Sequence, residues 1–386
     1  MNLKGLALCL TLCATNAVAE VTIDVGYLHV IVPPPPTLSN LDPVPDDIGL
    51  AGARTGLSDN ATTGTFLGHS YALIDRSVEA EGDPRAAARD LLAQTPFLIL
   101  DAPADVLTAI ADMPEAAEAL IFNTGASDMA LRAAECRGNV LHTGLSDAMR
   151  TDALAQFLVW RRWQDLAMIV GPREEDRAFA EVMRASLTKF GLRLEAEKEW
   201  RNDSDIRRAA AQEVPLFTQD LGDYDALIVA DMAEDFGRYL EYNTWRPRPV
   251  TGTDGLVPLG WAPVVEQWGA AQLQSRFEEA HGRDMLARDY AAWAAMRTLG
   301  EAVTRTDSGD LATLRGYILS DAFELAGFKG RPLTYRDWNG QLRQPVALAH
   351  ARALVATAPL EGFLHQTNEL DTLGLDRPES TCEAFE

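Results

Sequence analysis

Histidine, cysteine and acidic residues are all present, but their spacing matches no familiar catalytic or metal-binding signature. The sequence has no G-x-S-x-G elbow, no Walker loop, no H-E-x-x-H and no G-x-G-x-x-G after its first apolar run. Asp42, Asp46 and Asp47 lack the EF-hand pattern and fit a solvated acidic surface better than a metal site. The histidines are scattered, and we expect surface or core-edge roles for them: His29, His69, His142, His281, His350 and His365. These residues favour a binding protein over an enzyme and indicate no cofactor.

The first residues have the pattern of a Sec-type signal peptide. Lys4 supplies a short charged region, residues 5–14 are apolar, and Ala17-Val18-Ala19 forms a small-residue cleavage box. Cys13 follows Leu12, where lipid attachment needs a small residue, so soluble export is the better interpretation. We expect residues 1–19 to be removed and the mature protein to lie in the periplasm.

Cleavage would leave two of the four cysteines, Cys136 and Cys382. In an oxidising compartment such a pair is a disulfide candidate that would tie the chain end to an early element. Two buried free thiols are the alternative. No apolar run after residue 19 reaches the roughly 20 residues of a membrane span.

Composition and charge restrict the class of partner. Apolar residues make up 47% and charged residues 24% of the chain, as in folded globular proteins. The formal net charge of −23 makes nucleic acid and anionic membranes poor partners. Only four of the 34 basic residues are lysines, so arginine is the default cation and its presence at a site carries little information.

The elements that must position these residues alternate between short apolar runs and amphipathic segments. Strand patterns occur at 21–32, 69–78, 96–100, 118–123 and 139–143, and again at 166–171, 192–200 and 225–230. Helical patterns occur at 46–60, at 84–94 after the N-cap Asp83, and at 146–163, 173–190, 233–242, 268–282 and 288–305. Residues 331–354 alternate as a hairpin does, with Asn339-Gly340 at the turn. Two α/β series followed by a β-rich tail indicate parallel, doubly wound sheets.

Four segments resemble a known family: GARTGLSDNATTG (52–64), NTGASDMALR (123–132), NVLHTGLSDAMRTDAL (139–154) and DYAAWAAMRTLGEAV (289–303). They are similar to type I periplasmic solute-binding proteins of ABC transporters, in the leucine-binding-protein-like branch. Residues 33–64, 245–261, 268–277 and 333–345 further resemble the subfamily associated with PQQ-dependent alcohol dehydrogenase systems.

The resemblance implies an α/β fold of two doubly wound, Rossmann-like lobes joined by a three-strand hinge. Lobe 1 would comprise residues 20–143 and 262–331, and lobe 2 residues 144–261 and 332–386. The implied function is the solute-binding component of an ABC uptake system, closing over a small polar ligand. The implied partners are that ligand (PQQ, an alcohol-oxidation metabolite or an amino-acid-like solute) and an inner-membrane permease, with the protein itself a monomer.

In such a fold ligands bind where the strand carboxyl ends meet the cleft. The residues that the resemblance assigns to the ligand are Asp101, Ala102, Asn123, Thr124, Gly125, Ser127, Thr143, Gly144, Arg173, Asp231, Glu234, Thr253 and Trp261. Several of them are also good helix caps, which is the alternative role for each. The turn after the third strand reads DAPAD, where leucine-type receptors place serine and threonine for the ligand carboxylate, so an ordinary amino-acid grip is in doubt there.

Arg246 and Arg248 lie between prolines, next to Trp245. The family pattern makes residues 248–253 a strand of lobe 2, near a sheet edge where prolines cost few hydrogen bonds. We therefore expect the two arginines to be lobe-rim or edge-protecting residues rather than the group that binds an anionic ligand. A sensing receptor that does not transport, and an exported hydrolase with an unfamiliar site, are the alternative functions.

Overall fold

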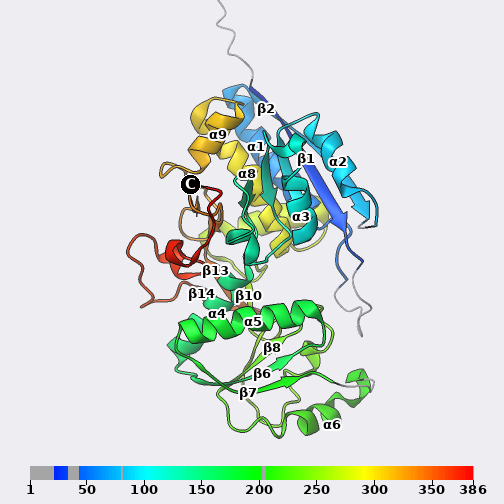
Figure 1. The fold of residues 1–386 in the computed structure, drawn as a ribbon, viewed down its shortest axis with the longest axis vertical. Helices are drawn as coiled ribbons and strands as arrows, with labels where there is room; N and C mark the ends of the chain where they lie inside the picture. The colour runs from blue at the N-terminus through cyan, green and yellow to red at the C-terminus, as the bar shows by residue number, and fades with distance from the viewer. Residues whose placement is uncertain (1–20, 34–42, 80, 202–205, 386) are drawn as a thin grey trace, which may run out of the picture.

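The computed structural model describes residues 21–33, 43–79, 81–201 and 206–385, so the predicted signal peptide lies outside it. Within these ranges no helix combines the length and the apolar content that a membrane crossing requires. Figure 1 shows two lobes stacked along the long axis of the molecule. The upper lobe is built from two separate stretches of chain, blue to cyan and yellow to orange, and the lower lobe is mainly green.

The first lobe is organised around five parallel strands in the order β2-β1-β3-β4-β5. The strands are β1 (Val21–Ile31), β2 (His69–Glu79), β3 (Phe97–Asp101), β4 (Leu120–Asn123) and β5 (Val140–His142). One face packs on α1 (Leu50–Leu67), α7 (Ala270–His281), α8 (Ala287–Thr306) and α9 (Leu311–Ile318), and the other on α2 (Pro84–Leu92) and α3 (Ala104–Ala111). Helices therefore cover both faces, as a doubly wound sheet requires.

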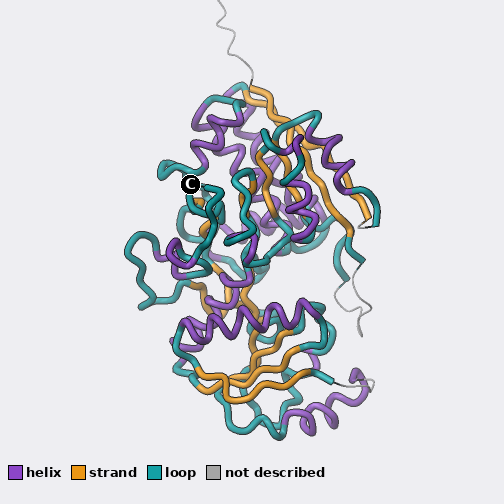
Figure 2. Tube along the Cα trace, viewed as in Figure 1, coloured by secondary structure: helices purple, strands orange, loops and turns teal. Residues whose placement is uncertain are grey.

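The second lobe repeats this arrangement with four parallel strands in the order β7-β6-β8-β9. The strands are β6 (Asp165–Val170), β7 (Arg193–Glu199), β8 (Ala226–Ala230) and β9 (Val250–Gly252). Helices α4 (Asp147–Arg161) and α5 (Glu174–Lys189) cover one face, and α6 (Ile206–Thr218) covers the other. Figure 2 shows the two sheets, in orange, as separate layers in the two lobes. The predicted fold class is confirmed, although the sequence patterns did not identify α6.

The helix predicted at residues 233–242 is wrong in extent. The structure has only a short 3-10 turn there, Gly237–Tyr239. The carboxylate of Asp231 accepts hydrogen bonds from the backbone N–H groups of Phe236 (2.7 Å) and Gly237 (2.8 Å), and Glu234 adopts a left-handed φ of 54°. A left-handed residue interrupts a helix, so the segment folds as a loop around Asp231.

Polar side chains join the segments that run between the lobes. The chain passes from lobe 1 to lobe 2 between β5 and α4, returns after β10 (Val257–Leu259), and crosses again before β13 (Val346–His350). The Gln341 side chain donates to the backbone carbonyls of His142 (3.2 Å) and Gly144 (2.9 Å), and Gln344 donates to that of Thr143 (2.8 Å). Both glutamines are buried, so these bonds fasten the third crossing to the first.

The hairpin of β11 (Thr334–Tyr335) and β12 (Leu342–Arg343) turns at Gly340, which has a φ of 67°. Tyr335 and Leu342 belong to the core of the first lobe, whereas Val346 of β13 belongs to that of the second. We therefore propose that the third crossing lies between residues 342 and 346, and not at 331/332. Strands β10, β13 and β14 (Ala353–Ala358) form a small antiparallel sheet.

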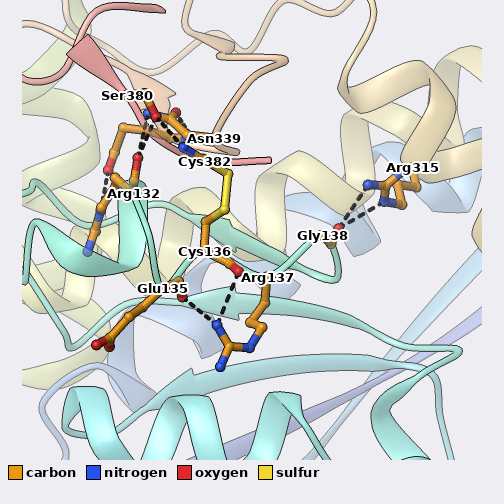
Figure 3. The surroundings of a disulfide bond; sticks show 10 residues. Arg132, Glu135, Cys136, Arg137, Gly138, Arg315, Asn339, Ser380 and Cys382 are labelled. Carbon is orange, nitrogen blue, oxygen red and sulfur yellow. Dashed lines mark hydrogen bonds between the residues drawn. A yellow bond between two sulfur atoms is a disulfide. The ribbon is translucent and has the colours of Figure 1, made fainter. Parts of the chain in front are cut away.

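The C-terminal tail, residues 369–385, contacts both lobes. Cys382 forms a disulfide with Cys136 of the first lobe, and Ser380 Oγ donates to the carbonyl of Arg132 (2.9 Å; Figure 3). In the second lobe, Lys189 Nζ donates to Glu379 (2.9 Å). The disulfide is one of the two arrangements that the cysteine count left open.

A buried cluster of charge anchors the start of this tail. Asp371 accepts hydrogen bonds from Arg336 Nε and Arg343 Nε, each at 2.8 Å. The Asp371 and Arg336 side chains are each 1% exposed. Removing the carboxylate would leave two guanidinium groups without their shared counter-ion, so the cluster depends on all three members.

Candidate functional site

The carboxyl ends of β3 and β4 form the first-lobe rim, residues 101–103 and 123–127. Because β4 is the neighbour of β3 in a parallel sheet, both strands end at the same edge. A Cβ atom added to Gly125 would lie 2.5 Å from Asp101 Oδ1 and 2.9 Å from the backbone nitrogen of Ala102. The two predicted segments are therefore in direct contact, and only glycine fits at position 125.

Asp101 is the most unusual group of this rim. The residue is 2% exposed, and its Oδ2 atom has no hydrogen-bond partner within the described ranges. Arg288, just inside the first turn of α8, lies 3.7 Å from Oδ1. Burial raises the pKa of Asp101, and the nearby Arg288 partly opposes this. A buried carboxylate oxygen without a partner is costly, which suits a position that a ligand donor can satisfy.

The other predicted residues of this rim are used mainly within the protein. The Asn123 amide donates to the carbonyl of Ala126 (2.8 Å) and contacts His142 Nδ1 (2.9 Å), while its oxygen accepts from the N–H of Ala126 (3.0 Å). Thr124 Oγ1 donates to the carbonyl of Leu100 (3.3 Å). Both side chains are buried, so they hold the turn in shape, and Ser127 is the partly exposed side chain of the rim.

The carboxyl ends of β6, β8 and β9 form the second-lobe rim, residues 171–173, 231–235 and 252–254. Thr253 Oγ1 accepts from the N–H of Asp231 (3.0 Å), so these two predicted residues lie together. Arg173 Nη2 lies 3.7 Å from Asp235, and Glu234 is exposed. Thus four of the predicted residues, Arg173, Asp231, Glu234 and Thr253, belong to one rim.

Acidic groups dominate the electrostatics of the second-lobe rim. Burial raises the pKa of Asp231, opposed by the hydrogen bonds from Gly237 and its neighbours. Burial and the charges of Asp231 and Glu234 raise the pKa of Asp254 to about 7. Carboxylates this close favour a partner that donates hydrogen bonds or carries positive charge. No cluster of metal-ligating side chains is found in the described part of the chain.

Three contacts in series connect the two rims. Ser127 Oγ donates to Asp147 Oδ2 at the start of α4 (3.0 Å), and Arg150 Nη1 donates to Asp147 Oδ1 (3.2 Å). The same Nη1 lies 4.0 Å from Met232 Sδ, which follows β8. The carboxyl ends of the two sheets are therefore connected across the first crossing through α4.

The remaining predicted residues lie in or near the crossings. The Thr143 and Gly144 carbonyls are occupied by Gln344 and Gln341. Trp261 is 4% exposed, donates to Gln274 (3.1 Å) and stacks on Tyr290 at a centroid distance of 4.9 Å. It lines a pocket at the hinge rather than either rim.

Arg246 and Arg248 lie away from the rims. They precede β9, the edge strand of its sheet, and each lies 3.4 Å from Asp223. Their side chains are 42% and 43% exposed. Both observations fit an edge-protecting role at the amino-terminal end of the strand.

Two rim residues escaped the sequence reasoning. Arg288 comes from α8, far along the chain from Asp101, and no spacing pattern connects them. Asp254 had a weak signal, because it follows the predicted Thr253 in the glycine-containing turn TGTDG. In both cases the tertiary neighbours, not the local sequence, create the site.

The comparisons with known proteins concern the fold. No protein-family model matches the chain, and no curated protein matches it. Many solved structures do. A branched-chain amino acid ABC transporter periplasmic ligand-binding protein from Burkholderia xenovorans LB400 has a TM-score of 0.70 at 15% identity, covering 94% of this chain and 100% of that one.

Two further matches were solved with ligands. An ABC transporter substrate-binding protein from Desulfitobacterium hafniense in complex with Leu has a TM-score of 0.63 at 14% identity, covering 86% of this chain and 99% of that one. A solute-binding protein from R. palustris in complex with benzoate has a TM-score of 0.62 at 13% identity, covering 94% and 99%. These neighbours are binding proteins. The chain therefore has the fold of the type I periplasmic binding proteins.

Proposed function

We propose that this protein is the periplasmic solute-binding component of an ABC-type uptake system, closing its two lobes over a small polar ligand. The observation that carries the proposal is the meeting of two polar rims, connected through Ser127, Asp147 and Arg150. Solved structures of this fold that span nearly the whole chain are solute-binding proteins, two of them described with Leu and with benzoate. The shared fold supports a solute-binding role here.

The charges of the rims suggest the chemistry of the ligand. Asp101 on one side, and Glu234 and Asp254 on the other, would accept hydrogen bonds from ammonium or hydroxyl groups. Arg288 is the cation beside Asp101, available to a ligand carboxylate. We therefore propose an amino-acid-like solute or a hydroxylated metabolite as the ligand.

A link to PQQ-dependent alcohol oxidation is the finer form of this proposal. It rests on the segments 33–64, 245–261, 268–277 and 333–345, which resemble the corresponding subfamily. PQQ itself carries three carboxylates, which the acidic groups of both rims would repel. We therefore favour an alcohol or its oxidation product over PQQ as the bound molecule.

A binding screen tests the proposal on a chain that starts at residue 20. Thermal shift and calorimetry would compare L-leucine, short alcohols with their aldehydes and acids, and PQQ. A ligand at 100 times its Kd adds about 2.7 kcal/mol of stability. We expect Asp101→Asn to weaken binding about tenfold or more, because the ligand loses a charged acceptor. The exposed Asp223→Asn is the matched control and should bind normally.

The outcomes separate the alternatives. Binding of PQQ with no response to the other compounds would refute the argument that the acidic rims exclude PQQ. No response to any compound class would refute the proposed solute-binding function. A sensing receptor requires the same closing lobes, so binding alone does not separate it from transport. Neighbouring genes for a permease and an ATPase would favour transport.

A further inference from the structure

A pocket at the hinge is lined by none of the residues that form the two rims. The space that it leaves for the centres of water-sized molecules is about 20 Å³, and the wider 310 Å³ between its walls includes open solvent. Its walls come from the second crossing, from the loop before the β11–β12 hairpin, and from the β13 and β14 strands. The side chains that shape it are Trp261, Val265, Trp268, Phe328, Lys329 and Thr357.

Two aromatic walls of this pocket are held in an uncommon backbone conformation. Trp268 has a φ of 56° and Phe328 a φ of 55°, in the left-handed region that bulky residues rarely adopt. A Cβ atom added to Gly330 would lie 2.6 Å from the Trp268 ring, and one added to Gly269 would lie 2.9 Å from the Phe328 ring. The Trp268 ring thus packs against Gly330, which follows Phe328 closely in the chain, and the Phe328 ring packs against Gly269, which follows Trp268. Such strained residues concentrate at functional sites, where the surrounding structure holds them in place.

Lys329 supplies the charge of the pocket. Its ammonium donates to Gln344 Oε1 (2.6 Å) and to the carbonyl of Pro345 (3.2 Å), and lies 4.4 Å from the centre of the Tyr290 ring. Within the described ranges no hydrogen bond or ion pair connects it to a carboxylate. Burial lowers its pKa well below the usual value, as expected for a cation that has no counter-ion. An anion from outside would satisfy this group.

We propose that the hinge pocket binds a second small ligand, a flat apolar molecule that carries a carboxylate. The aromatic walls would hold the apolar body and Lys329 the carboxylate. The half-exposed Trp268, at 48%, leaves the ligand a way in from solvent. Because Trp261 belongs to the first-lobe core and Thr357 to the β14 strand, an occupant would touch both sides of the hinge.

Calorimetry with phenylacetate tests the proposal, with 2-phenylethanol and 2-phenylethylamine as neutral and cationic probes of the same shape. We expect phenylacetate to bind about tenfold or more tightly than either, and Lys329→Met to lose that advantage. Lys198→Met is the matched control, because Lys198 lies in the second lobe and pairs with Asp220 (2.7 Å). Asp101→Asn should leave phenylacetate binding intact, which separates this pocket from the rims.

A second variant keeps the test independent of Lys329. Phenylacetate bound in the pocket should quench tryptophan fluorescence. Thr357→Phe would fill the pocket while leaving the Lys329 ammonium in place, and should abolish both phenylacetate binding and this quenching. The proposal is overturned if phenylacetate does not bind, if Lys329→Met binds it as the wild type does, or if Asp101→Asn alone removes binding.

Discussion

The disulfide between Cys136 and Cys382 should contribute strongly to stability, because it closes most of the chain into a loop. The two cysteines are 246 residues apart. For a loop of this length, the entropy removed from the unfolded chain corresponds to about 5.5 kcal/mol at 25 °C. Real denatured chains are more compact than the ideal one, so we expect the double variant Cys136→Ser/Cys382→Ser to lose about 2 to 5 kcal/mol of unfolding free energy.

Guanidinium denaturation of the two chains, each starting at residue 20, measures this loss. The tail should remain docked in the double variant, because Lys189 and Glu379 still hold it to the second lobe. Thiol labelling of the denatured, unreduced wild type is the control, since a closed disulfide leaves no cysteine to react. A loss below about 1 kcal/mol, or full labelling without reductant, would refute the reasoning.

Three further predictions concern buried charge, pH and close packing. Asp371→Asn should lose about 3 to 5 kcal/mol of unfolding free energy, because it leaves two arginines without their counter-ion. The exposed control Glu369→Gln should lose under about 0.5 kcal/mol. Equal losses of the two variants in denaturant titrations would contradict this prediction. The pKa of Asp254 is about 7 in the folded protein and near 3.8 when unfolded, so its stabilising contribution is complete below pH 4 and lost by about pH 7. Asp254→Asn should therefore be more stable than the wild type at pH 8 and equal to it near pH 4, and a difference that does not vary with pH would exclude a charge effect. Gly125→Ala should lose about 1 to 3 kcal/mol of unfolding free energy, because the added methyl group overpacks the first-lobe rim. Gly316→Ala, in α9, has open space around the added methyl group and should gain about 0.5 to 1 kcal/mol. If the melting curves of the two variants coincide, the rim is loosely packed.

Local sequence signals correctly predicted much of the fold. Asp83, the predicted N-cap, caps α2 by accepting the N–H of Ala86 at 2.9 Å. Gly340 turns the β11–β12 hairpin with its positive φ. Each signal depends only on residues a few positions apart, so it can be read before the chain is folded.

Predictions failed where a side-chain acceptor or tertiary packing outweighs the local helical pattern. The segment 233–242 has a helical pattern, but the Asp231 carboxylate takes the N–H groups of Phe236 and Gly237. Helix α6 contains Pro215, which weakens its helical signal, and its buried Ile206 and Val214 pack on the second sheet. Tertiary packing decides such marginal segments.

The sequence by itself determined two α/β series, an acidic chain unsuited to nucleic acid, and the strand ends at which polar residues gather, because apolar periodicity and caps are local properties. Only the tertiary structure decided which of those polar residues are free to act. In the folded protein, the side chains of Asn123 and Thr124 make hydrogen bonds within the protein. Within the described part of the chain, one oxygen of Asp101, which lies near Arg288, has no hydrogen-bond partner, and Lys329 is enclosed without a carboxylate. The surroundings of Asp101 and Lys329 depend on neighbours that lie far along the chain, so burial and charge pairing at a site become defined only when the lobes are packed.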